Sequence, residues 1–245
     1  LLNTKMTKQN NFDFLRFLFA IFVIVSHSYP LSGTPSCDWL CGITNGKLQF
    51  SDVGVKGFFI ISGYLIFQSL LRSKSLTDYF WKRCLRLFPA LLIVLLLTVL
   101  LAPIVYEGNV RYWENKSIYS YISKNLSLFK LQYSISGVFE KNSYGSAING
   151  SLWTICYEFT MYVLLAALFF FRKNESVLRV AFFVFYFVFA GYFFFLKDDL
   201  AYRFLDVQST TLAEFGLFFL GGSFLALLKF DQFKFMKLAT LVSGV

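Results

Sequence analysis

The sequence is poor in charged and metal-binding residues. It contains one histidine, four cysteines and 15% charged residues over 245 positions. No pair of cysteines has zinc-finger spacing to histidines, which argues against a structural zinc site. The first apolar block carries Arg16 and His27 and has no small-residue cleavage pattern, so it does not have the character of a signal peptide. The chain also lacks internal repeats and a heptad pattern.

Apolar residues, in contrast, are abundant and are gathered into long blocks. They make up 57% of the chain, with 33 phenylalanines, and the mean hydropathy is +0.59. A soluble domain averages about 45–50% apolar residues. The net charge of +9 does not indicate nucleic acid, because the lysines and arginines stand at the ends of the apolar blocks. The composition therefore predicts an all-α, polytopic helix bundle in a membrane.

We predict six full membrane spans and the start of a seventh. The six cover about Phe14–Leu31, Val53–Leu71, Leu87–Tyr106, Leu152–Phe171, Val177–Leu196 and Thr210–Leu228, and the seventh begins near Met236. Each full span is near the length that crosses about 30 Å of hydrocarbon, and a helix satisfies its own backbone hydrogen bonds there. The chain is thus interpreted as one partial transmembrane domain, residues 1–245, with a long external loop at 107–150.

The distribution of positive charge predicts the orientation. The N-terminal segment and the loops near residues 72–86, 172–179 and 229–237 are strongly basic, whereas the alternate loops are mixed or weakly charged. Basic loops face the cytoplasm, so a cytoplasmic N-terminus is predicted. Cys37 and Cys41 then share one short external loop, where either a disulfide or two free thiols is possible.

Two ionisable residues fall at membrane depth. His27 lies about four residues from the outer end of the first span, and Glu158 about six residues into the fourth, so both are expected roughly 5–10 Å below the outer surface. Ionisable groups at such depth are functional candidates, and a glutamate beside a histidine fixes its tautomer and stabilises imidazolium. The alternative is a hydrogen bond that only helps the helices to associate.

A second candidate group is the basic stretch from Trp81 to Pro89, which we interpret as a cytoplasmic loop with Pro89 in the first turn of the next helix. Arg83 and Arg86 are three residues apart, so they share a face if the stretch is helical. Arginine pairs suit phosphate binding. The alternative is an anchor to anionic lipid.

Smaller features have two readings each. Asp13 and Arg16 are three residues apart, which fits a local ion pair, or Arg16 receives an anionic ligand. The small residues among Gly57, Ser62 and Gly63 fit close helix packing, or they line a passage for a narrow ligand.

Four sequence segments occur in an order that resembles the membrane acyltransferase-3 family. They are Phe12-Asp13-Phe14-Leu15-Arg16 with His27 eleven residues after the arginine, Gly57-Phe58-Phe59-Ile60-Ile61-Ser62-Gly63-Tyr64-Leu65, Lys82-Arg83-x-x-Arg86-x-x-Pro89, and Ser151-Leu152-Trp153-Thr154-Ile155-Cys156-Tyr157-Glu158. Each segment alone is weak, but together they are specific, and they cover about residues 11–165.

The resemblance implies transfer of an acyl group, most often acetyl, from cytoplasmic acetyl-CoA to a sugar hydroxyl at the outer face. The acceptor would be a cell-surface or lipid-linked polysaccharide such as O-antigen, and the location a bacterial inner membrane, with lipid as the surrounding partner. No metal is implied. By resemblance, His27 is the catalytic histidine, Glu158 the acid near it, Arg83 and Arg86 contact CoA phosphates, and Arg16 is functional. Further motif positions are Ser62, Gly63, Tyr64 and Trp153.

The chain also departs from the family pattern. Ser26-His27 stands where many members have His-His, Thr154 where serine is commoner, and the chain stops near a seventh span where members have about ten. We therefore expect a C-terminally truncated domain. Two other classes stay open: a proton-coupled transporter or flippase with His27 and Glu158 as a relay, and a structural membrane subunit.

Overall fold

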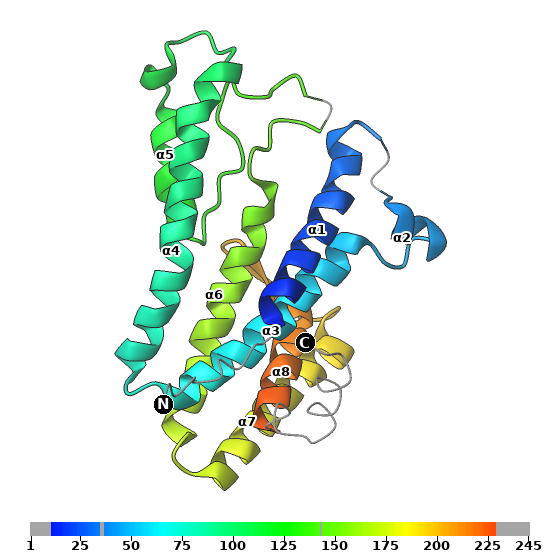
Figure 1. The fold of residues 1–245 in the computed structure, drawn as a ribbon, viewed down its shortest axis with the longest axis vertical. Helices are drawn as coiled ribbons and strands as arrows, with labels where there is room; N and C mark the ends of the chain where they lie inside the picture. The colour runs from blue at the N-terminus through cyan, green and yellow to red at the C-terminus, as the bar shows by residue number, and fades with distance from the viewer. Residues whose placement is uncertain (1–10, 35–36, 143, 229–245) are drawn as a thin grey trace, which may run out of the picture.

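The computed structural model describes residues 11–34, 37–142 and 144–228, and the chain there is a helix bundle with one small hairpin (Figure 1). Its α-helices and strands are α1 (Phe12–Leu31), α2 (Trp39–Ile43), α3 (Phe50–Arg72), α4 (Leu76–Leu101), α5 (Lys116–Leu126), α6 (Trp153–Leu165), α7 (Glu175–Gly191), β1 (Arg203–Phe204), β2 (Val207–Gln208) and α8 (Ser209–Leu227). Short 3₁₀ segments are η1 (Ala102–Val105), η2 (Tyr112–Glu114), η3 (Gly150–Leu152) and η4 (Ala166–Phe171), and η5 (Tyr192–Leu196) is a π-helical turn.

Six helical segments are long and apolar enough to cross a membrane, which confirms the predicted fold class. They are Phe12–Leu31, Phe50–Arg72, Leu76–Val105, Gly150–Phe171, Glu175–Leu196 and Ser209–Leu227. The α3–α4 and α6–α7 connections lie at one end of the molecule, the segment that follows α4 lies at the other, and the α1–α3 connection with α2 projects from the side (Figure 1). The predicted seventh span near Met236 lies outside the described residues.

Helix α3 lies between α1 and α8 and is the centre of the bundle. The α1–α3 register is fixed by a hydrogen bond from Ser26 Oγ to Ser51 Oγ, 3.1 Å long. On its other side, α3 approaches α8 so closely that a Cβ on Gly63 would stand 1.8 Å from the Phe219 carbonyl oxygen. Ser223 Oγ donates to the Gly63 carbonyl at 3.0 Å. Gly63 therefore serves close helix packing.

The prediction for the start of the third span is wrong. Residues 81–89 are not a loop but part of α4, which begins at Leu76 behind an N-cap in which Ser75 Oγ accepts from the Asp78 amide. Pro89 lies inside this helix rather than in its first turn. The basic residues had suggested a loop, but a polar turn at a membrane edge can be helical when its termini are capped.

An outer layer, defined here as residues 102–152, covers the end of α4. It has its own buried core, which includes Tyr112, Ile118, Tyr121, Ile135 and Val138, packed against α4. Figure 1 shows α5 alongside α4. The region predicted as one long loop thus contains a helix and a hydrophobic core, which makes it a defined platform.

A disulfide joins Cys37 to Cys41 in the α1–α3 connection. Buried Asp38 organises this turn: its Oδ1 accepts from the Cys41 amide at 2.9 Å, and its Oδ2 accepts from the Phe50 amide at 2.8 Å. The carboxylate therefore connects the α2 turn to the first residue of α3, and the open question of disulfide or free thiols resolves to a disulfide.

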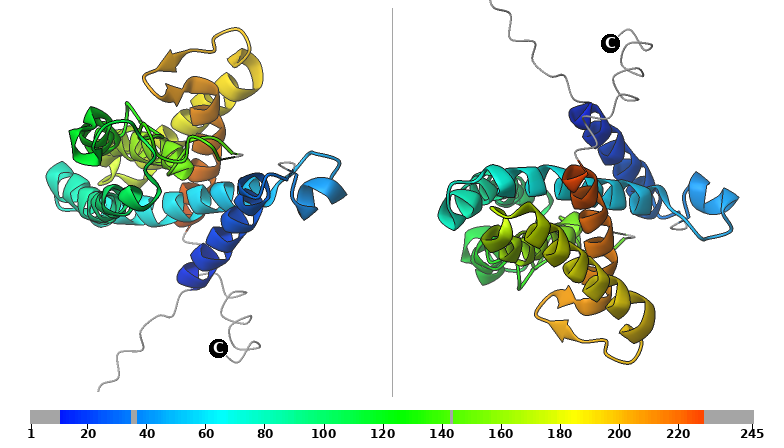
Figure 2. Two further views of the ribbon diagram at one scale, coloured as in Figure 1. Left: turned by 90° about the horizontal axis from the view of Figure 1, so that it is seen from above. Right: turned by 90° about the horizontal axis from the view of Figure 1, so that it is seen from below.

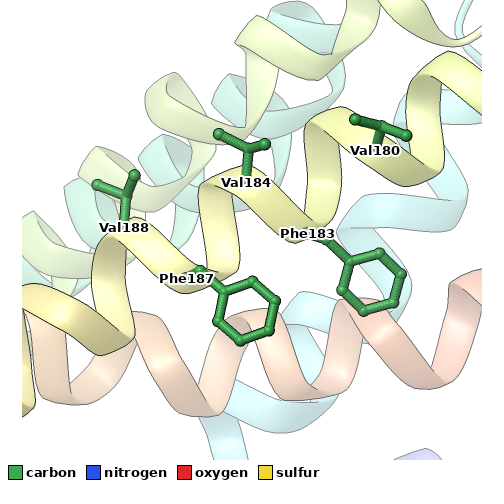
Figure 3. A pocket seen from close by; sticks show the side chains of 5 residues that line it. All are labelled: Val180, Phe183, Val184, Phe187 and Val188. Atoms are coloured by element: carbon green, nitrogen blue, oxygen red, sulfur yellow. The ribbon is translucent and has the colours of Figure 1, made fainter.

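The hairpin of β1 and β2 lies on the opposite side of the bundle from α1 (Figure 2). Helix α7, near this side, carries a hollow of about 510 Å³ between Val180, Phe183, Val184, Phe187 and Val188 (Figure 3). All five side chains are apolar and at least 40% exposed. Nothing in this hollow can bind or transform a polar substrate, and its character is that of a lipid-facing surface.

Candidate functional site

A cavity of about 230 Å³ lies where α1, α3, α4 and α6 converge. We call it the arginine–glutamate cavity, and its lining consists of Arg16, Val55, Phe58, Phe59, Ser62, Arg86, Thr154 and Glu158. Three charged side chains from three different helices share this small, half-apolar space. Charged groups held at membrane depth indicate a ligand site.

Glu158, on α6, is held by two hydroxyl donors. Ser62 Oγ, from α3, donates to Glu158 Oε1 at 2.9 Å, and the Tyr162 hydroxyl, one helical turn along α6, donates to the same oxygen. Both donors require an acceptor, so the geometry fits a carboxylate that accepts. Among the residues described, Glu158 forms no ion pair with either arginine of the cavity.

The two arginines of the cavity differ in their protein partners. Arg16 Nη1 lies 3.2 Å from Asp13 Oδ1, which confirms the predicted local ion pair. Arg86 has no hydrogen-bond or ion-pair partner within the described part of the chain. A guanidinium has five N–H donors. Most donors of Arg16 and Arg86 therefore remain available to an anionic ligand.

The structure separates Arg83 from Arg86. Arg83 is 7% exposed, buried among helices, and its Nη2 donates to Ser69 Oγ at 2.8 Å. Its guanidinium carbon lies 5.8 Å from the ring centre of Tyr79 and 6.0 Å from that of Tyr162. Of the two arginines, the structure therefore brings Arg86 to the cavity, whereas Arg83 packs beside Tyr162.

His27 and Glu158 do not meet in the structure, which separates them along α3. The Ser26–Ser51 bond sets His27 level with the start of α3, whereas Glu158 bonds to Ser62, eleven residues further along α3. At 1.5 Å per residue this separation is about 16 Å along the helix. Counting from span ends fails because packing sets the tilt and offset of neighbouring helices.

His27 itself is half-buried in the C-terminal half of α1. It has no hydrogen-bond partner among the residues described. Arg16 stands three helical turns below it on the same helix and lines the arginine–glutamate cavity. Arg16 and His27 therefore lie at two different levels of α1, and Arg16 alone of the two lines the cavity.

The other motif residues have structural settings. Gly63 meets α8 as described above, and buried Tyr64 packs against Phe12 with ring centres 5.1 Å apart. Trp153 is 36% exposed and contacts Tyr157 and Phe215. Of this group, only Ser62 lines the cavity.

Sequence reasoning missed two features. Tyr162 stands four residues after Glu158, a spacing that places both on one helix face, so it could have been found. Lys56 Nζ on α3 lies 2.8 Å from Glu214 Oε1 on α8, and both charges fall inside predicted spans, where they stood out as costly. No group of three or more His, Cys, Asp or Glu that could hold a metal occurs in the described ranges.

Comparison with known proteins gives two curated relatives. An "O-acetyl transferase" of Shigella phage Sf6 is 35% identical over 181 residues, covering 74% of this chain and 52% of the relative. "Nodulation protein 10" of Rhizobium leguminosarum bv. viciae is 33% identical over 170 residues, covering 65% of this chain and 44% of the relative. The chain thus spans about half the length of the curated relatives that it matches.

No solved structure matches this chain significantly. A family model does: that of acyltransferase family 3, described as an acyltransferase domain, matches residues 9–244, nearly the whole chain. The match contains all four motif segments and the three charged residues of the arginine–glutamate cavity. The chain therefore belongs to the acyltransferase-3 family.

Proposed function

We propose that this chain is the donor-side part of a membrane O-acyltransferase. It moves an acetyl group from cytoplasmic acetyl-CoA to a hydroxyl of a cell-surface or lipid-linked polysaccharide. The observation that carries the proposal is the convergence of Arg16 and Arg86 with Glu158 on one cavity, with His27 three turns further along α1. The relative named O-acetyl transferase and the family match support the reaction class.

The donor enters from the basic side of the molecule. Residues 72–86 and 172–179 carry eight of the 23 lysines and arginines. The α3–α4 and α6–α7 connections to which they belong lie at one end, which the positive-inside rule assigns to the cytoplasm. The Cys37–Cys41 disulfide lies in an alternate connection, and disulfides persist in oxidising compartments. Both features support a bacterial inner membrane location with the outer layer on the external side.

Arg86 and Arg16 would bind the phosphates of CoA. Arginine forms charge-assisted, bidentate hydrogen bonds to phosphate, and Arg86 has no competing acid among the described residues. The pantetheine arm would then run outward past Ser62 and Glu158 toward His27. Because the long external loop is a folded layer, it would present the acceptor from the outer face.

His27 would act on the acceptor hydroxyl. As a general base it removes the hydroxyl proton while the oxygen attacks the thioester carbonyl, and the thiolate of CoA leaves. The rival route is a covalent acyl-histidine, in which the imidazole nitrogen takes the acetyl group first and passes it to the hydroxyl. A histidine with no hydrogen-bond partner among the described residues fits either role, because its unprotonated ring nitrogen is not engaged by them.

The test is release of CoA thiol by membranes that contain the complete gene product, with acetyl-CoA and candidate glycans. Acetyl-CoA consumption that depends on a glycan and on His27 supports the proposal. Proton-coupled transport without CoA consumption would support the transporter alternative instead. Absence of both activities in the parent protein would leave a structural subunit.

A further inference from the structure

The two oxygens of Glu158 have different surroundings. Oε1 accepts from both Ser62 Oγ and the Tyr162 hydroxyl. Oε2 has no hydrogen-bond donor within the described residues, and it is not among their buried unpaired atoms. Since Glu158 lines the arginine–glutamate cavity, Oε2 is the oxygen available to a ligand there.

Tyr162 is held in place by a hydrogen bond to its backbone, by a contact to its ring and by burial. Its backbone carbonyl accepts from the Tyr79 hydroxyl at 3.0 Å, and its ring faces the Arg83 guanidinium. The side chain is 1% exposed. A hydroxyl fixed this firmly restricts the carboxylate that it binds, because the rotation of Glu158 would break a buried hydrogen bond.

The cavity therefore has a polarity pattern. Arg16 and Arg86 offer hydrogen-bond donors and positive charge, and Glu158 Oε2 offers an acceptor. A complementary ligand has anionic groups followed by an N–H or O–H donor. Among parts of acetyl-CoA, the phosphates match the arginines, and the amide groups of the pantetheine arm match the carboxylate.

We propose that Tyr162 is a positioning residue that, with Ser62, fixes Glu158 so that Oε2 accepts a hydrogen bond from a pantetheine amide of the donor. This inference rests on the proposed function, since it takes acetyl-CoA as the donor. Arg83 belongs to the same support, through Tyr162, and does not touch the ligand.

The experiment compares two probes on purified protein in detergent: CoA, and adenosine 3′,5′-bisphosphate, which has phosphates but no pantetheine arm. In Tyr162→Phe, the affinity for CoA should fall about fivefold, because a charge-assisted hydrogen bond is weakened. The affinity for adenosine 3′,5′-bisphosphate should not change, because the arginines are intact. A merely structural role would move both affinities together.

Two variants complete the design. Ser62→Ala removes the other donor to Oε1 and should reproduce the selective loss, even if Tyr162→Phe folds poorly. Tyr112→Phe is the matched control. It deletes the buried hydroxyl of a tyrosine in the outer layer, which donates to the Val99 carbonyl of α4 at 2.6 Å. Its affinities should equal those of the parent.

The outcomes separate the two proposals. If the parent binds neither probe, the acetyl-CoA donor itself is wrong. If the parent binds CoA but Tyr162→Phe and Ser62→Ala bind both probes as the parent does, or lose both equally, the positioning role is overturned while the proposed function stands.

Discussion

The two ends of α1 carry different chemistry. Arg16 shares a cavity with Arg86 and Glu158, and His27 stands about 16 Å further along the same helix. In the proposed function, this eleven-residue spacing would place one group at each end of an extended donor. Anion binding and acyl transfer are thus expected to be separable by single substitutions.

His27→Ala should lower acetyl transfer by about 100-fold or more, because it removes the proposed general base or nucleophile. The affinity for CoA should be unchanged, since the phosphates bind elsewhere. Thiol release and CoA titration measure the two. Ser28→Ala, one residue away on the same helix, is the control and should retain activity. Normal transfer by His27→Ala would refute the assignment.

Arg83 and Arg86 should differ when each is replaced by alanine. Arg86→Ala should weaken CoA binding about tenfold, the loss of a charge-assisted contact, with an unchanged melting temperature. Arg83→Ala should lower the melting temperature, because it removes the hydrogen bond to Ser69 and the packing against Tyr162. Equal effects of the two variants on CoA binding would contradict this division.

At the scale of elements, the contact between α3 and α8 depends on backbone proximity. Gly63 and Gly222 each face a carbonyl of the other helix, at distances that exclude a methyl group. Small residues permit such approach in membrane bundles. This contact places α3 correctly, and α3 in turn supplies Ser62 to Glu158.

Gly222→Ala should destabilise the protein by about 1–3 kcal/mol through overpacking, because its Cβ would stand 1.9 Å from the Ile60 carbonyl oxygen. Gly221→Ala is the neighbouring control: a Cβ there meets nothing within 4 Å, so its melting temperature should be maintained or rise slightly. Thermal unfolding in detergent compares them. Similar melting temperatures for the two would argue against the close contact.

The α2 turn should be sensitive to acid. Burial raises the pKa of Asp38, but the backbone hydrogen bonds from Cys41 and Phe50 outweigh it, so the pKa is lower than usual. The stabilisation is complete above the unfolded value of about 3.9 and is lost as pH falls through the lowered folded value. Phosphine reduction of the Cys37–Cys41 disulfide should be constant from about pH 5 upward and accelerate below about pH 4.

Asp38→Asn provides the comparison for that experiment. It should be reduced faster at neutral pH, because one of the two carboxylate hydrogen bonds is lost, and it should show little further acceleration in acid. An acid response equal to that of the parent would exclude Asp38 as its origin.

At the scale of the whole molecule, the apolar blocks and the placement of charges are sufficient to predict six spans. They do not predict how the helices are tilted and offset against one another. The third span shows the limit: the basic residues around Arg83 suggested a loop, but Ser75 caps a helix that contains them. Glu158 shows a second limit, since tilt and offset come from packing that no single helix encodes. The proximity of Tyr162 to Glu158, in contrast, is predictable, because residues four apart lie on the same face of a helix.

The orientation of the bundle gives a prediction for the complete chain. Reporter fusions after residue 130 should be active only in the external compartment, and fusions after residue 74 only in the cytoplasm, because residues 72–86 are strongly basic. The reverse pattern would place the donor side outside and the acceptor side in the cytoplasm, and it would contradict the proposed direction of transfer.

The outer layer packs on α4 in a hydrophobic cluster that is distinct from the cluster around Tyr162, and the two clusters share partly buried residues such as Leu87, Phe129 and Phe159. Its surface can therefore vary without disturbing the packing around Glu158. Under the proposed function, this division would favour recombination: residues 102–152 could be replaced when the acceptor glycan changes, while the binding site for the acyl donor is kept. Diversity of specificity within the family would then concentrate in residues 102–152, and hybrids joined at those boundaries would be viable.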